Sequence, residues 1–516
     1  MILRRAYGGL NVLRTQALAF WEIWPLAGLA LAMTLVYLRA PHVIGLPYDD
    51  SYISLTFARN LAEHGFLTFD GREASAGATS VLHVAVLAVP IKLGLSPVHA
   101  SLAAGIVAQI GLVLATYWLA WTIFRDRLTA ALAGFSIAVM GYVVADALNG
   151  METSLFLLVS TAAAAALFGA RNERGMLAAG VLAALAVLCR PEGGLLVAAM
   201  GLYYAVDPER AGPLLSPGSL RRLILLGAPA LLTLVALSIF YGAATGSLAP
   251  GTASAKLQFF REFDAPLRIR FDMTLAALGN FSGPVLPWLA LAGYGASRRQ
   301  ALVFAFFWCA FFVLYLMLFP GGLGHYWYRY MHVFLPPIAV FASAGAVSLL
   351  RGRSFRAWDV VPIALIGSML AGAMVLQYNS FRNHYADDVT VNEQRQVGLA
   401  RYLSETVPPG DTIATHDIGA IGYFSGRELI DLVGLINPDA VDYHDGRRLR
   451  EYVDSVQPDY IVVLPSWEDR YLQLGLTKDP ALFELIAVFD TPGREPFIVY
   501  RTHYESRLPV GVTRPP

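Results

Sequence analysis

Long apolar runs alternate with short polar segments from the N-terminus to about residue 377. Eleven such runs can be distinguished, and most of them approach the about 20 residues that a membrane-spanning helix needs. They lie at residues 17–38, 99–124, 128–147, 153–170, 176–188, 192–205, 222–242, 274–296, 300–319, 331–350 and 358–377. The pattern predicts a polytopic α-helical membrane protein with about 11 transmembrane helices.

Two of these runs, 176–188 and 192–205, are short and meet at Arg190-Pro191. We expect a turn there, because proline disfavours a continuing helix and a charge at the middle of a bilayer is costly. A further apolar stretch, residues 81–95, carries a proline and a lysine near its end. We expect this stretch to lie along the outer membrane interface or to re-enter the membrane, because counting it as a span would put basic loops outside.

The basic residues indicate the orientation of the chain, since loops rich in Lys and Arg stay in the cytoplasm. With eleven crossings, five Arg-containing loops fall on the same side as the N-terminus, at residues 125–127, 171–174, 207–222, 297–299 and 351–356. The first run is long enough to stay as an anchor, and no small-residue cleavage site follows it. We therefore predict a multi-pass protein of the plasma membrane with a cytoplasmic N-terminus.

The hydrophobic pattern changes at about residue 378. Helical patterns at residues 391–406 and 445–455 then alternate with short β-rich runs, such as those at 459–464 and 496–501. This alternation predicts a soluble α/β domain at 378–516 on the external face of the membrane. Residues 1–377 would form the transmembrane domain, with a first external loop at 39–98.

Composition agrees with a membrane protein: the 516 residues are 56% hydrophobic and 15% charged, and the mean hydropathy is +0.52. The 38 basic residues balance the 38 acidic ones, so the chain has no field that would attract nucleic acid, and we exclude that partner. Cys189 and Cys309 both lie in apolar runs and suit small buried side chains. No internal repeat is evident, which argues against an inverted-repeat transporter.

Two adjacent carboxylates, Asp49 and Asp50, follow the first span by about a dozen residues. One can act as a general base on an acceptor hydroxyl, while the other orients a partner or helps to bind a cation. The alternative is a turn that caps the next helix, because Asp is a favoured N-cap residue. That helix is amphipathic: Arg59 and Asn60 would face water or a ligand, and apolar side chains such as Tyr52 would face lipid.

Other charged residues gather in the predicted external loops. Lys256 lies in a loop rich in Gly, Ala, Ser and Thr and suits a lipid-linked phosphate; the alternative is a lysine that snorkels to the interface. Glu152, Arg190 and Glu192 lie at the ends of spans. Such groups face either a cavity or each other, so a structural ion pair is an equally good account.

The segment "GHYWYRY" contains His325, Tyr326 and Arg329, and we expect it to open a helix. Aromatic rings can stack on sugars or isoprene units and an arginine can bind phosphate, although membrane interfaces favour aromatic belts in any case. Carboxylates, cations and aromatic rings together indicate an active site that faces lipid.

Residues 48–83, "YDDSYISLTFARNLAEHGFLTFDGREASAGATSVLH", resemble the start of the GT-C superfamily of integral-membrane glycosyltransferases. The resemblance is to the branch of the mycobacterial terminal arabinofuranosyltransferases. It continues in "NGMETSLF", "LCRPEG", the "FYG…AK" loop and "THDIGAIGYFSGRELIDLVGLINPD", and so extends over most of the chain in order. The sequence departs from the family at Ala78, where Tyr is usual, at His83, where Trp is common, and in "GGLGHYW", which lacks an Asp.

The resemblance implies a transferase that takes a sugar, arabinofuranose being one candidate, from a polyprenyl phosphate on the external face. The sugar passes with inversion to a hydroxyl of a cell-envelope glycan or glycolipid. Asp49 would be the base and Asp50 would support it. The substrate-binding residues would be Arg59, Asn60, Thr79, Ser80, His83, Glu152, Arg190, Glu192, Lys256, His325, Tyr326 and Arg329.

The C-terminal domain would contact the acceptor or brace the catalytic loops, with His416 packed in a turn beside Asp417. No cofactor is certain, and a divalent cation is left open because family members differ. The donor lipid, the acceptor and membrane lipid are the expected partners. The alternative function is a transporter or flippase of a lipid-linked sugar, which would place its site at mid-membrane between two related halves.

Overall fold

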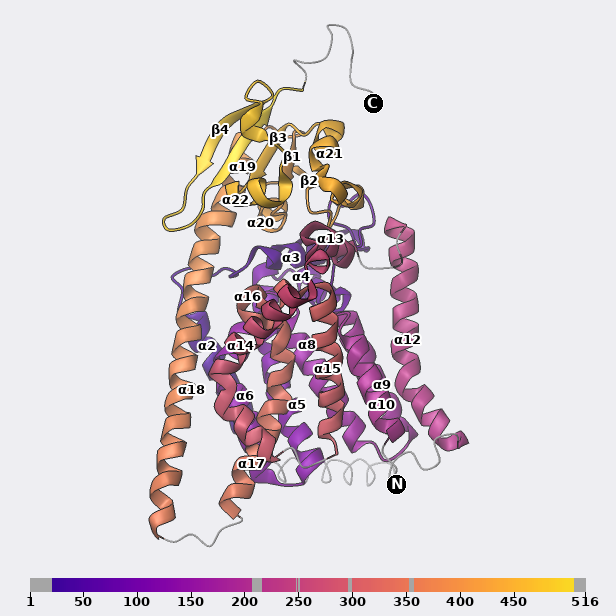
Figure 1. The fold of residues 1–516 in the computed structure, drawn as a ribbon, viewed down its shortest axis with the longest axis vertical. Coiled ribbons are helices and arrows are strands. Elements are labelled where there is room, and N and C mark those ends of the chain that lie inside the picture. The colour runs from indigo at the N-terminus through magenta and orange to yellow at the C-terminus, as the bar shows by residue number, and fades with distance from the viewer. Residues whose placement is uncertain are drawn as a thin grey trace.

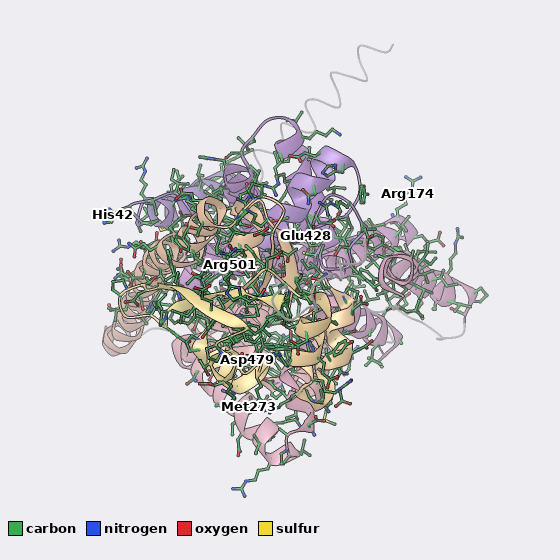
Figure 2. The ribbon with its side chains drawn as sticks, turned by 90° about the horizontal axis from the view of Figure 1, so that it is seen from above. His42, Arg174, Met273, Glu428, Asp479 and Arg501 are labelled. Carbon is green, nitrogen blue, oxygen red and sulfur yellow. The ribbon has the colours of Figure 1, made fainter. Side chains whose placement is uncertain are left out.

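A computed structural model describes residues 21–206, 216–246, 248, 251–295, 299–351 and 357–504 of the chain. A bundle of long helices stands below a small α/β domain, and short helices fill the layer between them (Figure 1). Seen from above, Glu428 and Arg501 of the α/β domain lie over the middle of the bundle, whereas Arg174 and Met273 lie toward its rim (Figure 2). The fold is that of a polytopic α-helical membrane protein with a C-terminal α/β domain.

Each of the eleven predicted runs overlaps a helix. These helices are α2 (Ile23–Leu38), α5 (Pro97–Phe124), α6 (Arg127–Val139) with α7 (Gly141–Asp146), α8 (Thr153–Gly169), α9 (Glu173–Cys189), α10 (Gly193–Val206), α12 (Pro217–Thr245), α14 (Leu267–Gly295), α15 (Ala301–Leu318), α17 (Leu335–Arg351) and α18 (Ala357–Asn392). Among the described residues, four helical stretches are long and apolar enough to cross a membrane by length and composition: Pro97–Phe124, Pro217–Thr245, Ala301–Leu318 and Pro320–Arg351. The number of crossings stays a prediction.

The orientation also stays a prediction. The N-terminal arginines and most of the basic loops at 207–222 and 351–356 lie outside the described residues. The stretch predicted at the interface forms α4 (Val81–Lys92), whose 12 residues span only about 18 Å. It lies beside α3 (Asp49–His64), at the end of the bundle that carries the α/β domain (Figure 1).

Local sequence explains where the helices begin and how closely they pack. Asp126 caps α6 by accepting a hydrogen bond from the amide of Thr129 at 3.0 Å. Gly105 of α5 lies so close to the carbonyl of Ala147 that a Cβ atom would overlap it. Small residues of this kind let neighbouring helices approach closely, as membrane bundles require.

The C-terminal domain contains one five-stranded sheet with the order β2-β1-β3-β5-β4. Its strands are β1 (Thr412–Thr415), β2 (Glu428–Asp431), β3 (Tyr460–Val463), β4 (Phe483–Phe489) and β5 (Phe497–Thr502). The first three strands in this order are parallel, and β5 pairs antiparallel with both β3 and β4. The helices α19 (Gly398–Thr406), α20 (Gly419–Phe424), α21 (Leu449–Val456) and α22 (Pro465–Trp467) belong to the same domain. The predicted β-rich run at 459–464 contains β3, and the run at 496–501 contains all of β5 but its last residue.

The two domains are continuous through α18, which runs from the bundle up into the C-terminal domain (Figure 1). A π-helical stretch, Glu393–Val397, joins α18 to α19. The boundary expected at residue 378 therefore falls inside one helix. A connection of this kind couples the position of the C-terminal domain to the bundle.

The lipid-facing role predicted for one side of α3 is wrong. Tyr52 is fully buried, and its ring packs against the rings of Tyr423 and Phe424 at centroid distances of 5.5 and 5.2 Å. Both partners are the last two residues of α20 (Gly419–Phe424) in the C-terminal domain. The apolar side of α3 is covered because the C-terminal domain docks on it.

Candidate active site

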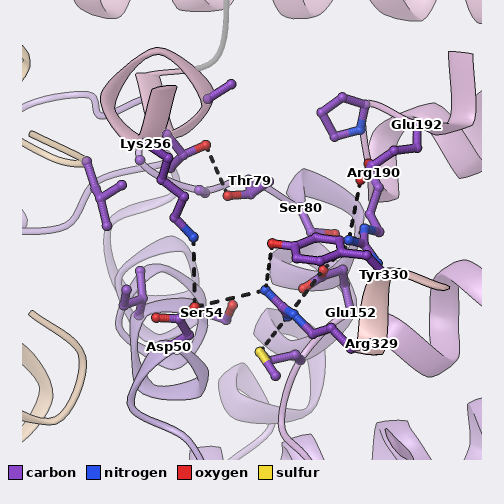
Figure 3. A pocket seen from close by; sticks show the side chains of 18 of the residues that line it. Asp50, Ser54, Thr79, Ser80, Glu152, Arg190, Glu192, Lys256, Arg329 and Tyr330 are labelled. Carbon is purple, nitrogen blue, oxygen red and sulfur yellow. Dashed lines mark hydrogen bonds and ion pairs between the residues drawn. The ribbon is translucent and has the colours of Figure 1, made fainter. Parts of the chain in front are cut away.

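A cavity of about 230 Å³ lies between the start of α3, the loop before α4, the turn between α9 and α10, and α13 (Gly251–Phe260). Figure 3 shows its polar side chains, which converge from elements far apart in the chain. It brings together eight of the residues predicted from the sequence: Asp50, Thr79, Ser80, Glu152, Arg190, Glu192, Lys256 and Arg329.

Asp50 lies in the first turn of α3, and its side chain is 28% exposed. Its Oδ2 atom is 3.9 Å from Nζ of Lys256 and 3.9 Å from a terminal nitrogen of Arg329. Both distances exceed hydrogen-bonding range. The carboxylate therefore attracts both cations without hydrogen-bonding to either. The terminal nitrogens of Arg329 donate instead to the sulfur of Met151 and the hydroxyl of Tyr330.

The two arginines of the cavity are held by buried carboxylates. Oε1 of Glu152 lies 3.6 Å from Nε of Arg190 and 3.7 Å from a terminal nitrogen of Arg329. Glu192 lies 3.5 Å from Arg190 and accepts a hydrogen bond from the hydroxyl of Tyr315 at 2.6 Å. The network fixes the guanidinium groups at the cavity wall, as preorganised anion binding requires.

Spare donor capacity is concentrated on two of the cations. Within the described part of the chain, Nε of Arg329 has no hydrogen-bond partner, and Lys256 has only its distant ion pair with Asp50. Apolar side chains form the adjoining wall: Ile53, Phe57, Val84, Leu257, Leu314, Leu318 and Phe319. Cations with free N–H groups beside an apolar wall suit a phosphate attached to a hydrocarbon chain.

Asp49 faces away from this cavity. Its carboxylate accepts hydrogen bonds from the amides of Gly419 and Ala420, at 2.8 and 2.7 Å. Burial raises the pKa of Asp49, the charges of Asp417 and Asp50 add to the rise, and the two amides oppose it. In this geometry Asp49 joins α3 to α20 of the C-terminal domain.

Three other predicted residues make structural contacts outside the cavity. Arg59 donates to the carbonyl of Tyr423 at 3.4 Å and lies over its ring. Asn60 donates to two carbonyls of the loop that follows α3, and His83 lies 3.2 Å from the carbonyl of Gly150. These contacts hold the loops around the cavity in place.

The segment around residue 327 forms only the short, distorted turn α16 (His325–Tyr328), and a 3-10 turn at Arg329–Phe334 then leads into α17. Tyr326, Trp327 and Tyr328 all have positive φ, of 43°, 58° and 66°. This backbone is costly for residues other than glycine. It turns Tyr326 away from the cavity, and neither Tyr326 nor His325 lines it.

Sequence reasoning missed several side chains of the cavity. Tyr315 lies in the middle of an apolar run, so no local signal distinguishes it from a lipid-facing residue. The hydroxyl of Thr79 donates to that of Thr252 at 3.1 Å, and the ring of Tyr330 lies 4.4 Å from the guanidinium of Arg190. Tyr330 stands in the aromatic segment that the sequence had singled out.

The donor set does not fit a resident cation. Among the described residues, no group of three or more His, Cys, Asp and Glu side chains is close enough to hold a metal ion.

Comparison with solved structures identifies the class of fold. ArnT from Cupriavidus metallidurans, bound to undecaprenyl phosphate, is 13% identical with a TM-score of 0.58, and the match covers 93% of this chain and 97% of that chain. The archaeal oligosaccharyltransferase AglB from Archaeoglobus fulgidus, in complex with an inhibitory peptide and a dolichol-phosphate, is 12% identical with a TM-score of 0.56, covering 96% and 75%. The chain has the fold of the GT-C glycosyltransferases.

The arabinofuranosyltransferase AftD from mycobacteria has the same fold. It is 12% identical with a TM-score of 0.51, and the match covers 93% of this chain but only 40% of that chain. Residues 383–506 match a family model described as a domain of unknown function, DUF8728. No curated protein matches the sequence.

Proposed function

We propose that this protein is an inverting glycosyltransferase that moves a sugar from a polyprenyl-phosphate donor to a hydroxyl of a cell-envelope glycan or glycolipid. One observation carries the proposal: Asp50 lies in one cavity with two cations that retain free N–H groups, beside an apolar wall. The two cations can bind the phosphate, the apolar wall can contact its lipid, and Asp50 can act as the base within the same cavity. The lipid phosphates named with ArnT and AglB support the same chemistry.

In the proposed reaction the carboxylate of Asp50 accepts the proton of the acceptor hydroxyl. The hydroxyl oxygen forms a bond to the anomeric carbon while the bond from that carbon to the phosphate oxygen breaks. The polyprenyl phosphate leaves with the bonding electron pair, and Lys256 and Arg329 stabilise its added charge. One displacement inverts the configuration of the sugar. This proposal gives the role of base to Asp50, where the family resemblance favours Asp49.

The finer features of the proposal come from the sequence. Arabinofuranose is the first donor sugar to test, because of the resemblance to the mycobacterial branch. The reaction would take place at the external face of the plasma membrane, where the C-terminal domain would cover the site. Glu152 and Glu192 would orient the arginines, and Thr79 and Ser80 would bind the sugar.

The test is to incubate the purified full-length protein with polyprenyl-phosphate sugars, both pentofuranose and hexopyranose, and to measure release of polyprenyl phosphate with an acceptor glycan. We expect release with one donor class, and release that is slower by orders of magnitude from Asp50→Asn. Movement of a labelled sugar lipid across vesicles without any transfer product would overturn the proposal and support a flippase.

A further inference from the structure

A second cavity, of about 520 Å³, lies on the other side of the first turn of α3. Asp49 lines this second cavity and Asp50 lines the first one. The two cavities are therefore bordered by consecutive residues. The wall of the second cavity comes from both domains: Pro47, Tyr48, Asp49, Gly324, Tyr326, Trp327, Tyr328, Asp388, Val391, Asn392, Arg395, Gln396, Asp417 and Arg494. The mechanism proposed above uses none of these residues.

Two backbone irregularities contribute to the wall of the second cavity. One is the left-handed segment of Tyr326, Trp327 and Tyr328. The other is the π-helical stretch Glu393–Val397, which supplies Arg395 and Gln396 to the wall. Strained backbone and π-helical turns are both costly and concentrate at functional sites. Their meeting at one cavity points to a binding role.

Aromatic rings form one face of the second cavity. Trp327 is 37% exposed, and its indole N–H donates to Oδ2 of Asp388 at 3.0 Å. One side of its ring packs on His384 at a centroid distance of 4.3 Å. Tyr326 stacks on Tyr48 at 4.1 Å. An aromatic ring fixed at its edge and still exposed is suited to stack on the C–H face of a sugar ring.

Polar side chains on α18 and the π-helical stretch have unused hydrogen-bonding capacity. Asn392 is 3% exposed and donates to the carbonyl of Leu46 at 2.7 Å, but its Oδ1 atom has no partner within the described residues. In that same part of the chain, Nε of Arg395 and Oε1 of Gln396 also lack partners. Unpaired buried polar atoms are costly, so a ligand with hydroxyl groups would offset that cost.

The charges of the second cavity indicate which ligand fits. Asp49, Asp388 and Asp417 face Arg395 and Arg494, so neither sign dominates. A lipid phosphate or an acidic glycan would find no concentrated positive charge here, whereas a neutral, hydroxyl-rich molecule would find donors and acceptors.

We propose that the second cavity binds the acceptor as a neutral saccharide, with Trp327 as the stacking ring and Asp388, Asn392 and Gln396 as hydrogen-bonding partners. The inference rests on the proposed function, since it supplies that reaction with its acceptor. A saccharide bound there would lie next to the first turn of α3. That turn carries Asp50, the proposed base, directly after Asp49, which lines the second cavity.

The test uses saturation-transfer NMR to measure glycoside binding to the full-length protein in lipid nanodiscs. The three probes are methyl α-D-arabinofuranoside, methyl α-D-mannopyranoside and the charged methyl β-D-glucuronide. We expect transfer to at least one neutral glycoside and a loss of affinity of about tenfold in Trp327→Ala. Trp327→Phe should retain most of the binding, since it keeps an aromatic face. Trp118→Ala is the matched control, because Trp118 is also 37% exposed and lines neither cavity.

Three outcomes would overturn the inference: no transfer to either neutral glycoside, equal transfer in Trp327→Ala and the unmodified protein, or a preference for the glucuronide. Binding of undecaprenyl phosphate is measured in parallel to separate the two proposals. If the lipid phosphate binds and the donor is consumed while the glycosides fail, only the acceptor inference fails. If undecaprenyl phosphate does not bind and no donor is consumed, the proposed function itself fails.

Discussion

Asp49 and Asp50 are consecutive residues whose carboxylates face different cavities. Asp49 accepts hydrogen bonds from the amides of Gly419 and Ala420 in the C-terminal domain. Asp50 lies 3.9 Å from both Lys256 and Arg329. The pair thus joins a contact between domains to the cationic cavity within one helical turn, and substitutions at the two positions should have different effects.

Asp50→Asn should lower kcat by about 10²–10⁴-fold while leaving the affinity for the donor lipid nearly unchanged. The amide keeps the shape of the side chain but cannot accept the proton of the acceptor hydroxyl. Single-turnover assays and undecaprenyl phosphate binding would measure the two quantities. Unchanged turnover in Asp50→Asn would show that Asp50 is not the base.

Asp49→Asn should act mainly on stability. An amide side chain can accept only one of the two backbone hydrogen bonds, and its NH₂ group would face the other N–H. We expect the free energy of unfolding to fall by about 1–3 kcal/mol, with binding of undecaprenyl phosphate retained. Thermal unfolding of the purified protein measures the change. A loss of turnover without any loss of stability would return the role of base to Asp49.

Lys256→Ala should weaken donor binding by about tenfold or more, because a hydrogen bond to a charged group contributes about 1.5–3 kcal/mol. Lys256 makes no hydrogen bond within the described residues, so its removal leaves no buried partner unpaired. Lys256→Arg keeps the charge and should restore part of the affinity. The measurement is the Kd for undecaprenyl phosphate, and equal Kd values for all three proteins would remove Lys256 from the phosphate site.

Hydrophobic pattern predicted much of this fold because the bilayer dictates it. The run at 99–124 lies within α5 (Pro97–Phe124), and the run at 222–242 lies within α12 (Pro217–Thr245). The strands β3 and β5 follow from β-rich runs in the same way. Each of these elements depends on neighbours in the sequence, which a pattern of residues records directly.

Side-chain direction in the candidate site could not be predicted, because it depends on distant partners. The amide that Asp49 binds at Gly419 is 370 residues away. No local pattern indicates which carboxylate of an adjacent pair will face a cavity. The left-handed backbone at Trp327 is likewise imposed by tertiary contacts, since sequence rules expect glycine at positive φ.

Gly419→Ala should disrupt docking of the C-terminal domain. A Cβ atom at this position would overlap the backbone carbonyl and carboxylate oxygens of Asp49, and backbone atoms cannot move aside at little cost. We expect faster proteolysis between the domains and a loss of turnover. Gly410→Ala tests a glycine with nothing within 4 Å of its Cβ position, although its φ of 99° adds local strain. Docking that survives Gly419→Ala would contradict this contact.

Stability should fall as pH rises above the acid range, because of the buried carboxylates between the domains. Burial, followed by the charge of Asp50, raises the pKa of Asp417 above the about 3.9 of an unfolded aspartate. Between those two pKa values the folded protein binds more protons than the unfolded chain, so the free energy of unfolding decreases with pH. The stability contributed by protonated Asp417 is lost completely once the pH exceeds the raised pKa of that residue.

Asp417→Asn removes that titrating group and should flatten the decline in stability between about pH 4 and about pH 7, because the pKa of Asp417 is raised to about 7. It should also stabilise the protein at the upper end of this range, since a neutral amide does not repel Asp50. Thermal unfolding across the range measures both effects. The control is Asp469→Asn, an exposed carboxylate of the same domain, which should leave the slope unchanged. Equal slopes for Asp417→Asn and the unmodified protein would mean that Asp417 is ionised throughout, so its carboxylate would not store a proton between the domains.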